Sequence, residues 1–216
     1  MQVHRIIDES FDVNLYILIS NEIALIDAGT GDNATETIRK INKVVDIKKI
    51  KKIILTHRHY DHVGGVFGIK KIANPEIYMH KDDAHVIEEG NTEESFAFGF
   101  FTKFEPLKVN ILNDMDEIDV GDKKLKIIHT PGHTTGSICI YESTAKLLFS
   151  GDTVFTNGSV GRWDLPTGSY ELLLSSMRKL LKLEIKALYP GHGEFVKENG
   201  THHINLGLKL LLSFKE

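Results

Sequence analysis

The sequence predicts a mixed fold of helices and strands, of class α/β or α+β, as a single domain over residues 1–216. Apolar segments with strand-like and helix-like spacing alternate in both halves of the chain. Several strand-like segments end in a short turn that places His or Asp beside glycine. With 41% hydrophobic and 26% charged residues the chain can bury one substantial core, and no Pro/Gly/Ser-rich linker divides it.

In the first half the pattern predicts a strand pair, a helix and a short buried strand. Residues 14–20 and 22–27 are apolar enough to form two paired strands joined near Asn21. Helical spacing covers residues 34–45, and a short apolar strand covers 53–56. The basic run before this last strand is interpreted as a solvated turn, and it comprises Lys48, Lys49, Lys51 and Lys52.

In the second half the pattern predicts four strands and two helices. The strands cover residues 124–128, 137–141, 146–149 and 187–189. The helices cover residues 169–183, with Ser169 as the N-cap, and 203–214. Cys139 lies inside a predicted strand and is the single cysteine, so we expect a buried thiol without reactive chemistry or an intramolecular disulfide.

The segment between His80 and Met115 fits neither a clean helix nor a clean strand. It holds five of the 11 phenylalanines, namely Phe96, Phe98, Phe100, Phe101 and Phe104. Aromatic clusters usually pack inward, so burial in the core is the expected outcome. The alternative hypothesis is a lid that presents aromatic rings to an apolar part of a substrate.

The most informative motif is His57-x-His59-x-Asp61-His62, which directly follows an apolar segment. Side chains at i and i+2 of an extended segment leave the same face, so His57 and His59 can bind one ion. Asp61 continues the alternation, and a turn at Val63-Gly64-Gly65 would let Asp61 and His62 serve a second ion. Imidazole and carboxylate ligands suit zinc, iron, manganese and cobalt.

Three further turns, each after a predicted strand, supply the remaining candidate ligands. They place His133, Asp152 and His192 beside glycines. A lone histidine is more often structural than a ligand, but three such turns together with the first motif reverse that expectation. No ligand motif surrounds the other histidines, namely His4, His80, His85, His129, His202 and His203.

In this order, the motifs resemble those of metallo-β-lactamase-fold hydrolases, specifically the glyoxalase II-like (hydroxyacylglutathione hydrolase-like) branch, over most of the chain. The resemblance implies an αββα sandwich, in which two mixed sheets are flanked by helices. It also implies two divalent metal ions per chain, with zinc as the first expectation and iron or manganese as alternatives. The implied ligands are His57, His59 and His133 for one ion, and Asp61, His62 and His192 for the other, with Asp152 bridging them.

The resemblance assigns two roles outside this ligand set. Asp27 corresponds to a buried residue that organises the metal loop, although an ordinary turn Asp is the alternative. Arg162 lies after the bridging Asp in a segment that resembles glyoxalase II-like and persulfide dioxygenase-like members. It is therefore the candidate for binding a substrate carboxylate, and a structural ion pair with Asp164 is the alternative.

The expected activity is hydrolysis of a small thioester or ester. Two ions about 3.5 to 4 Å apart lower the pKa of a bridging water, so that hydroxide can attack a carbonyl carbon. Asp61 is the residue expected to orient that hydroxide. No general acid beyond the ligands is evident in the sequence, which favours a thiolate or alkoxide leaving group over an amine.

Two departures from related families narrow the expected substrate. Few residues follow His192, so the helical region that binds glutathione in glyoxalase II is not expected, and neither is glutathione specificity. Lactonases of this fold carry Tyr where this chain has Phe155, which disfavours a lactone. The rival functions are a mononuclear Fe(II) persulfide dioxygenase using His57, His133 and Asp152, a metal-dependent nuclease, and a noncatalytic metal-binding protein.

Charge and hydropathy bear on partners and location. The formal net charge is −4 and the pI is near 6.3, which argues against nucleic-acid binding. The longest apolar runs are too short to cross a bilayer, and the N-terminal residues lack the apolar segment of a signal peptide. We therefore expect a cytoplasmic protein with a small-molecule substrate and no membrane partner, and a homo-oligomer is left open.

Overall fold

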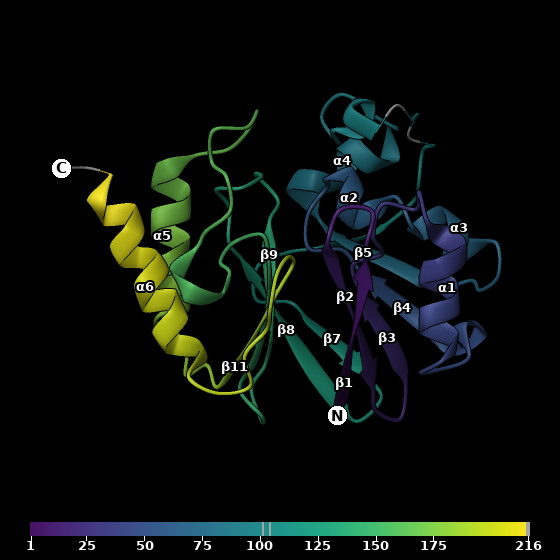
Figure 1. Cartoon of the computed structure of the whole chain (residues 1–216), viewed down its shortest axis with the longest axis horizontal. Coiled ribbons are helices and arrows are strands. Elements are labelled where there is room, and N and C mark those ends of the chain that lie inside the picture. Colours follow the sequence, from purple (N-terminus) through teal and green to yellow (C-terminus); the bar gives the residue numbers. More distant parts are fainter. Residues whose placement is uncertain (101, 104, 215–216) are drawn as a thin grey trace.

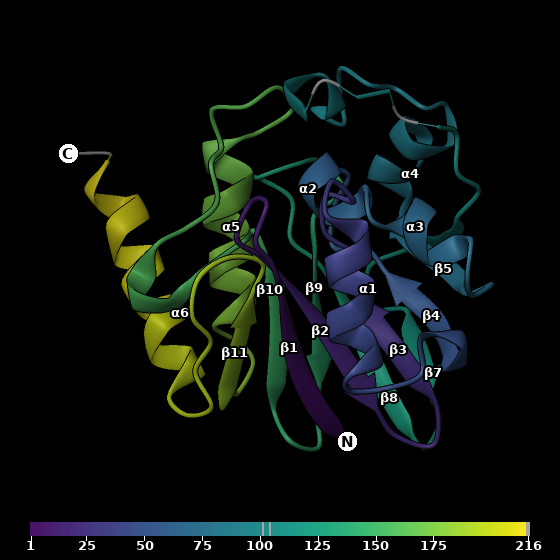
Figure 2. The same cartoon turned by 45° about the vertical axis from the view of Figure 1, so that its right-hand side comes forward.

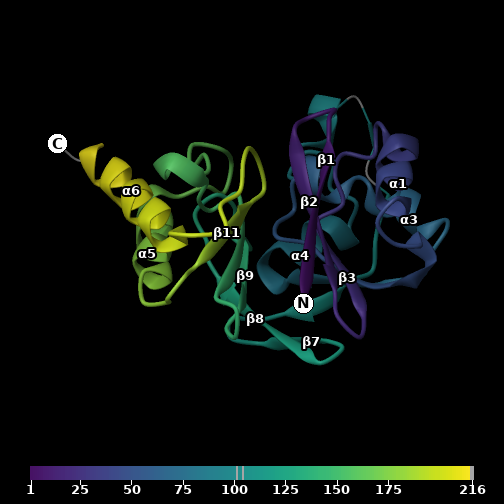
Figure 3. The same cartoon turned by 60° about the horizontal axis from the view of Figure 1, so that its bottom comes forward.

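Two β-sheets face each other, and helices cover both outer faces (Figures 1 and 3). This arrangement is seen in a computed structural model that describes residues 1–100, 102–103 and 105–214. The αββα sandwich predicted from the resemblance is confirmed. No helix in this part of the chain is long and apolar enough to cross a membrane.

The first sheet combines an antiparallel N-terminal part with a parallel C-terminal part. Its strands are hydrogen-bonded in sequence order, antiparallel from β1 to β3 and parallel from β3 to β6. The bounds are β1 Gln2–Asp8, β2 Val13–Ile19, β3 Ile23–Ile26, β4 Ile50–Ile54, β5 Glu76–His80 and β6 Asn110–Leu112.

The second sheet has the strand order β11-β10-β9-β8-β7. Neighbouring strands are antiparallel except for β10 and β11, which are parallel. The bounds are β7 Glu117–Val120, β8 Lys123–His129, β9 Ile138–Glu142, β10 Leu147–Gly151 and β11 Ala187–Pro190.

The helices form the two outer layers, and Figure 2 shows α1 beside the first sheet and α5 and α6 beside the second. The N-cap predicted at Ser169 is confirmed, because its Oγ accepts a 3.3 Å hydrogen bond from Leu172 N. The α-helices are α1 Ala34–Asn42, α2 Tyr60–Val63, α3 Val66–Lys70, α4 Lys81–Glu88, α5 Tyr170–Leu180 and α6 Gly200–Ser213, and the short 3₁₀ helices are η1 Ile47–Lys49, η2 Ala97–Phe100 and η3 Thr156–Gly158.

Alternation along β2 explains why the sandwich has apolar layers on both sides of the first sheet. Tyr16 and Leu18 pack between the two sheets, whereas Leu15 and Ile17 pack in the layer shared with α1 and α3. Successive side chains of a strand point to opposite faces. A strand buried on both faces is apolar at nearly every position, as β2 is apart from Asn14.

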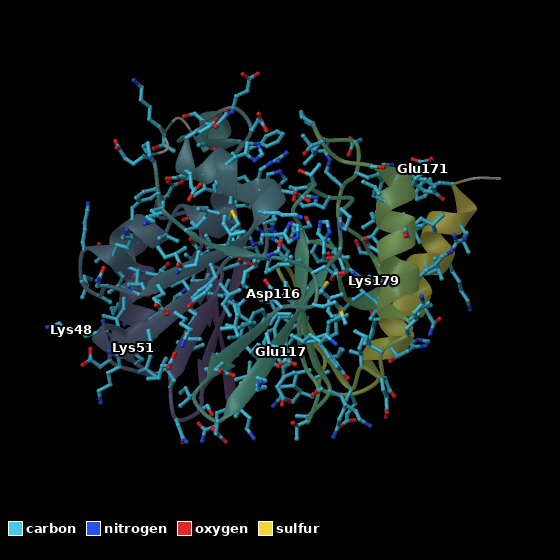
Figure 4. All side chains as sticks on the ribbon, turned by 180° about the vertical axis from the view of Figure 1, so that it is seen from behind. Lys48, Lys51, Asp116, Glu117, Glu171 and Lys179 are labelled. Carbon is cyan, nitrogen blue, oxygen red and sulfur yellow. The ribbon has the colours of Figure 1, made fainter. Side chains whose placement is uncertain are left out.

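Strand β4 begins earlier than the sequence pattern predicts. It starts at Ile50, so Lys51 and Lys52 lie inside the strand and not in a turn before it. The earlier start comes from pairing with another segment of the chain, because the parallel pairing with β3 extends β4 toward its N-terminus. The solvated character of the basic run holds for Lys48 and Lys51, whose side chains point outward at the edge of the molecule (Figure 4).

The segment between His80 and Met115 contains α4, η2 and β6. Ser95 and Ala97 are buried and Phe96 is half-buried. Phe101 and Phe104 lie outside the described residues, and so do the side chains of Phe98 and Phe100. Of the five phenylalanines, Phe96 is therefore the one whose side chain bears on the choice between core and lid.

Candidate metal centre

The loop after β4 carries four of the candidate ligands. It bends at residues 56–58 and enters helix α2 at Tyr60, so the extended alternation predicted through Asp61 is wrong. After α2, Gly65 packs closely against the loop after β3, where a Cβ would lie 1.9 Å from the carbonyl oxygen of Ala28. Asp61 and His62 therefore lie on a helical turn.

Three histidines meet in a first cluster made of His57, His59 and His133. Their candidate ligand atoms all lie within 4.8 Å of one another, and all three residues are buried. His133 Nε2 lies 2.9 Å from His59 Nδ1. The ring of His57 completes the cluster, with centroid distances of 4.7 and 4.8 Å to the other two rings.

A second cluster of Asp61, His62 and His192 lies beside the first. The Nε2 atoms of His62 and His192 are 3.3 Å apart. Asp61 Oδ2 lies 3.3 Å from His192 Nε2 and 3.6 Å from His62 Nε2. Asp61 and His62 are adjacent on α2, and His192 follows β11. Their carboxylate and two imidazoles thus converge on one point.

Asp152 lies between the two clusters. Its Oδ2 is 3.7 Å from His133 Nε2 and 3.5 Å from His192 Nε2, and its Oδ1 is 3.4 Å from His62 Nε2. The chain can approach it closely only because residue 191 is glycine, since a Cβ there would lie 2.3 Å from Asp152 Oδ1. All seven predicted ligands are therefore brought together, with Asp152 in the position expected of a bridge.

The outer nitrogens of two histidines are fixed by backbone carbonyls. His133 Nδ1 donates to Arg162 O at 2.8 Å, and His192 Nδ1 donates to Asp12 O at 3.1 Å. A carbonyl oxygen only accepts, so each Nδ1 carries the hydrogen and each Nε2 is directed into the clusters. Metal-binding histidines are typically held in this way.

Three buried atoms of the cluster residues lack a hydrogen-bond partner among the described residues. They are His57 Nε2, His59 Nε2 and Asp152 Oδ1. Buried polar atoms are nearly always hydrogen-bonded, so these atoms require an explanation. A divalent cation would satisfy a buried imidazole nitrogen and a carboxylate oxygen, and the donor set of imidazole and carboxylate fits one.

The two clusters differ in protonation. Burial, together with the neighbouring histidines, holds the pKa values of His57 and His59 well below 6.5, so both are neutral. Burial also acts to lower the pKa of His62, but Asp152, Asp61 and Asp27 outweigh it and raise this pKa to about 10. Without a metal, His62 of the second cluster is therefore protonated, whereas His57 and His59 of the first are not.

Asp27 lies buried behind the metal loop. Its carboxylate accepts hydrogen bonds from Thr56 N and Thr56 Oγ1, both at 2.8 Å, and faces His62 Nδ1 at 2.8 Å. An Asp in an ordinary turn would not make these contacts with separate segments of the chain. The geometry agrees with the organising role expected for it.

Arg162 and Phe96 each contact a histidine of the first cluster. The Arg162 side chain is 67% exposed, and its guanidinium makes two contacts with Asp164, at 2.9 and 2.7 Å, which is the structural ion pair named as the alternative. A substrate-binding role for its side chain stays a prediction. The Phe96 ring lies edge-on to His59 with centroids 5.0 Å apart, so at least this aromatic ring is beside the clusters.

Sequence reasoning missed Arg58 and Asp83, which are both buried and form an ion pair next to the first cluster. A charged residue between two candidate ligands was the only local signal. A separate group of His80, Asp82 and His129 is also close enough to hold an ion. However, His80 Nδ1 accepts from Asp82 N, His129 Nε2 bonds to Thr135 O, and the two rings stack in parallel, so their lone pairs do not converge.

The family model described as "Metallo-beta-lactamase superfamily" matches residues 10–192. A protein of Methanocaldococcus jannaschii named "Probable metallo-hydrolase" is 38% identical over 85% of this chain and 89% of its own length. The hydroxyacylglutathione hydrolase GloC of Haemophilus influenzae is 33% identical over 90% of this chain and 92% of its own length. TTHA1623, crystallised in a di-iron-bound form, superposes with a TM-score of 0.76 at 28% identity, covering 96% of this chain and 97% of that chain.

The chain therefore belongs to the metallo-β-lactamase superfamily, as its motifs predicted. Members of this superfamily are generally hydrolytic enzymes that bind divalent metals.

Proposed function

We propose that the chain is a dinuclear metallohydrolase that cleaves a small thioester or ester. One observation carries this proposal: Asp152 lies between a cluster of three histidines and a cluster of two histidines and a carboxylate. A carboxylate has two oxygens that can each bind one ion. The arrangement is thus suited to two divalent ions, for which zinc is the first candidate and iron or manganese the alternatives.

The ions would act as Lewis acids and lower the pKa of bound water. The side chains around the ions would orient the attacking water. Asp61 is kept ionised because, although burial acts to raise its pKa, His62 and His192 lower it well below its ordinary range. An ionised Asp61 can accept a hydrogen bond from the attacking water and so direct it.

No protein nucleophile is needed in this scheme. Cys139, the single thiol, is fully buried in β9, and burial raises its pKa to about 11. A thiol of this kind stays protonated and is a poor nucleophile. A Cys139→Ala variant is therefore a control that should retain turnover.

A thioester or simple ester is favoured as the substrate. A thiolate leaves readily because the free thiol has a pKa near 8.5, so cleavage needs little help from a general acid. The hydroxyacylglutathione hydrolase among the relatives supports an acyl substrate of this class. Phe96 beside His59 would place an aromatic surface next to the apolar part of the acyl group.

The nearest rival is a mononuclear iron dioxygenase that would use His57, His133 and Asp152. Such an enzyme has no use for the second cluster of Asp61, His62 and His192, whereas a dinuclear hydrolase does. The second cluster therefore favours hydrolysis.

A screen of purified, metal-analysed protein tests the proposal. The substrates are thioesters, simple esters, lactones and glutathione persulfide, with oxygen uptake recorded in parallel. The expected result is two ions per chain and turnover of a thioester or ester without oxygen consumption. One iron per chain with persulfide-dependent oxygen uptake would show that the chain is the dioxygenase and not the hydrolase. If the two-metal protein turns over none of these substrates, both functions are rejected.

A further inference from the structure

Asp83 and Arg58 form a buried ion pair directly beside the first cluster. Asp83 in α4 is 0% exposed, Arg58 between His57 and His59 is 1% exposed, and Arg58 Nη1 lies 3.2 Å from Asp83 Oδ1. Burying two charges is costly unless the remaining hydrogen-bonding capacity of both groups is also satisfied. The other partners of this pair therefore matter.

The Asp83 carboxylate accepts hydrogen bonds from two loops at once. Its Oδ2 accepts a 3.0 Å hydrogen bond from Arg58 N, in the loop that carries His57 and His59. The same oxygen accepts a 2.7 Å hydrogen bond from Thr134 Oγ1, and Oδ1 accepts a 2.8 Å hydrogen bond from Gly136 N. Both of these donors lie in the loop that carries His133. One side chain thus links the first sheet's metal loop to that of the second sheet.

The Arg58 guanidinium extends this link to a third segment. Its Nη2 donates to Thr167 Oγ1, and its Nη1 lies 3.3 Å from Thr135 Oγ1 and 3.8 Å from Glu94 Oε2. Thr167 follows the segment of Arg162, whose carbonyl accepts from His133. Arg58 Nε has no hydrogen-bond partner among the described residues. None of the contacts of Arg58 and Asp83 involves a residue of the second cluster.

We propose that Asp83, through its pair with Arg58, is a positioning residue that fixes the distance between His57 and His59 on one loop and His133 on the other. It would thereby set the metal affinity of the first cluster in preference to the second. This inference rests on the proposed dinuclear site. The physical basis is that ligands on two loops must be held at fixed spacing to bind one ion tightly, and outer partners of this kind change metal affinity by about 10- to 100-fold.

An Asp83→Asn variant tests the assignment, because an amide keeps the shape but has no charge and one acceptor oxygen fewer. The matched control is Glu142→Gln. Glu142 is also buried and also accepts from two backbone nitrogens, Thr144 N at 3.2 Å and Ala145 N at 2.7 Å, but it lies at the far end of β9 from the metal loops. Both variants lose a buried carboxylate, and only one of them touches the first cluster.

The readouts are cobalt(II) affinity by competition with a chelator, the cobalt(II) absorption spectrum, and the melting temperature of the metal-free proteins. They are recorded in the otherwise unchanged chain and in a His192→Ala background, which keeps the first cluster and disables the second. We expect Asp83→Asn to weaken cobalt binding by about 10- to 100-fold in the His192→Ala background and to alter the spectrum. Glu142→Gln should lower the melting temperature without changing either property.

A milder variant keeps the test decisive if Asp83→Asn does not fold. Thr134→Val removes one hydroxyl that donates to Asp83 and should weaken cobalt binding by a few-fold, in the same direction. Unchanged cobalt affinity in both variants, or an equal loss in Glu142→Gln, would overturn the positioning role alone. If the unmutated chain binds no metal, the proposed function fails together with this inference.

Discussion

His62 Nδ1 and Asp27 Oδ2 lie 2.8 Å apart in a fully buried contact, and the same carboxylate also accepts the backbone and hydroxyl hydrogen bonds of Thr56. Asp27 directly follows β3, Thr56 follows β4, and His62 lies on α2. One carboxylate therefore sets the orientation of a second-cluster imidazole relative to two parallel strands. The backbone of Asp27 is left-handed, with φ of 57°, a conformation that Asp and Asn tolerate better than most residues.

Replacing Asp27 by Asn should weaken binding of the second ion by about 10- to 100-fold, because the amide is a weaker acceptor for His62 and Thr56. Asn keeps the left-handed backbone, so the change isolates the carboxylate. Metal titration against a chelator measures the effect. Asp46→Asn, at the N-cap of η1, is the matched control and should bind as the unmutated chain does.

Replacing Asp152 by Ala should reduce the metal content to one ion or less and abolish turnover. Two cations held side by side need the negative charge between them, and Ala removes the only described carboxylate that contacts both clusters. Metal analysis after dialysis is the measurement. Retention of two tightly bound ions would show that the dinuclear assignment is wrong.

Replacing Arg162 by Ala should reduce activity on carboxylate-bearing substrates by roughly tenfold to a hundredfold and leave neutral esters nearly unaffected. Lys should restore little, because a point charge does not reproduce the two-pronged contact of a guanidinium. Steady-state kinetics on paired charged and neutral substrates provide the measurement.

The control for the Arg162 variant is a change at Asp164, the residue with which Arg162 forms an ion pair. Asp164→Ala removes the exposed ion pair and frees the guanidinium, so it should not lower activity on anionic substrates. An exposed pair adds little stability, and neither change should move the melting temperature much. Equal losses on both substrate types, accompanied by a lower melting temperature in both variants, would make Arg162 a structural residue.

Metal affinity of the second cluster should rise with pH. In the metal-free protein the three carboxylates, acting against burial, raise the pKa of His62 from 6.5 to about 10, so a metal ion must displace this proton. Affinity should increase up to about pH 10, with about one proton released per chain near neutrality. Calorimetry in two buffers of different ionisation enthalpy counts these protons, and the absence of proton release would contradict the prediction.

The same raised pKa affects the metal-free fold. Protonated His62 stabilises the folded state fully below pH 6.5, and this contribution is lost as pH rises through about 10. The melting temperature of the metal-free chain should therefore fall over that range. His62→Gln should remove this part of the pH dependence, and an unchanged profile would assign it to another group.

Local patterns predicted the elements whose signals lie within a few residues. The strand pair β2 and β3, the helix α5 with its Ser169 cap, and the buried Cys139 are of this kind. Strands β1, β5, β6 and β7 were not predicted, and the start of β4 was placed too late. Strands β4, β5 and β6 pair in parallel with strands that are distant in the sequence, and a sequence pattern carries no information on such pairing. Strands β1 and β7 pair with the next strand of the chain, but polar residues make up much of both, so their apolar signal is weak.

The sequence by itself determined which side chains are available for metal chemistry, because His57, His59, Asp61, His62, His133, Asp152 and His192 stand in recognisable motifs. Only the tertiary structure decided how they are held. The contacts of Asp27 with His62 and of Asp83 with Arg58 join residues from separate segments. Such contacts form only where separate segments of the folded chain meet, and burial makes their hydrogen bonds obligatory, whereas nothing in the sequence distinguishes Asp83 from an ordinary surface residue.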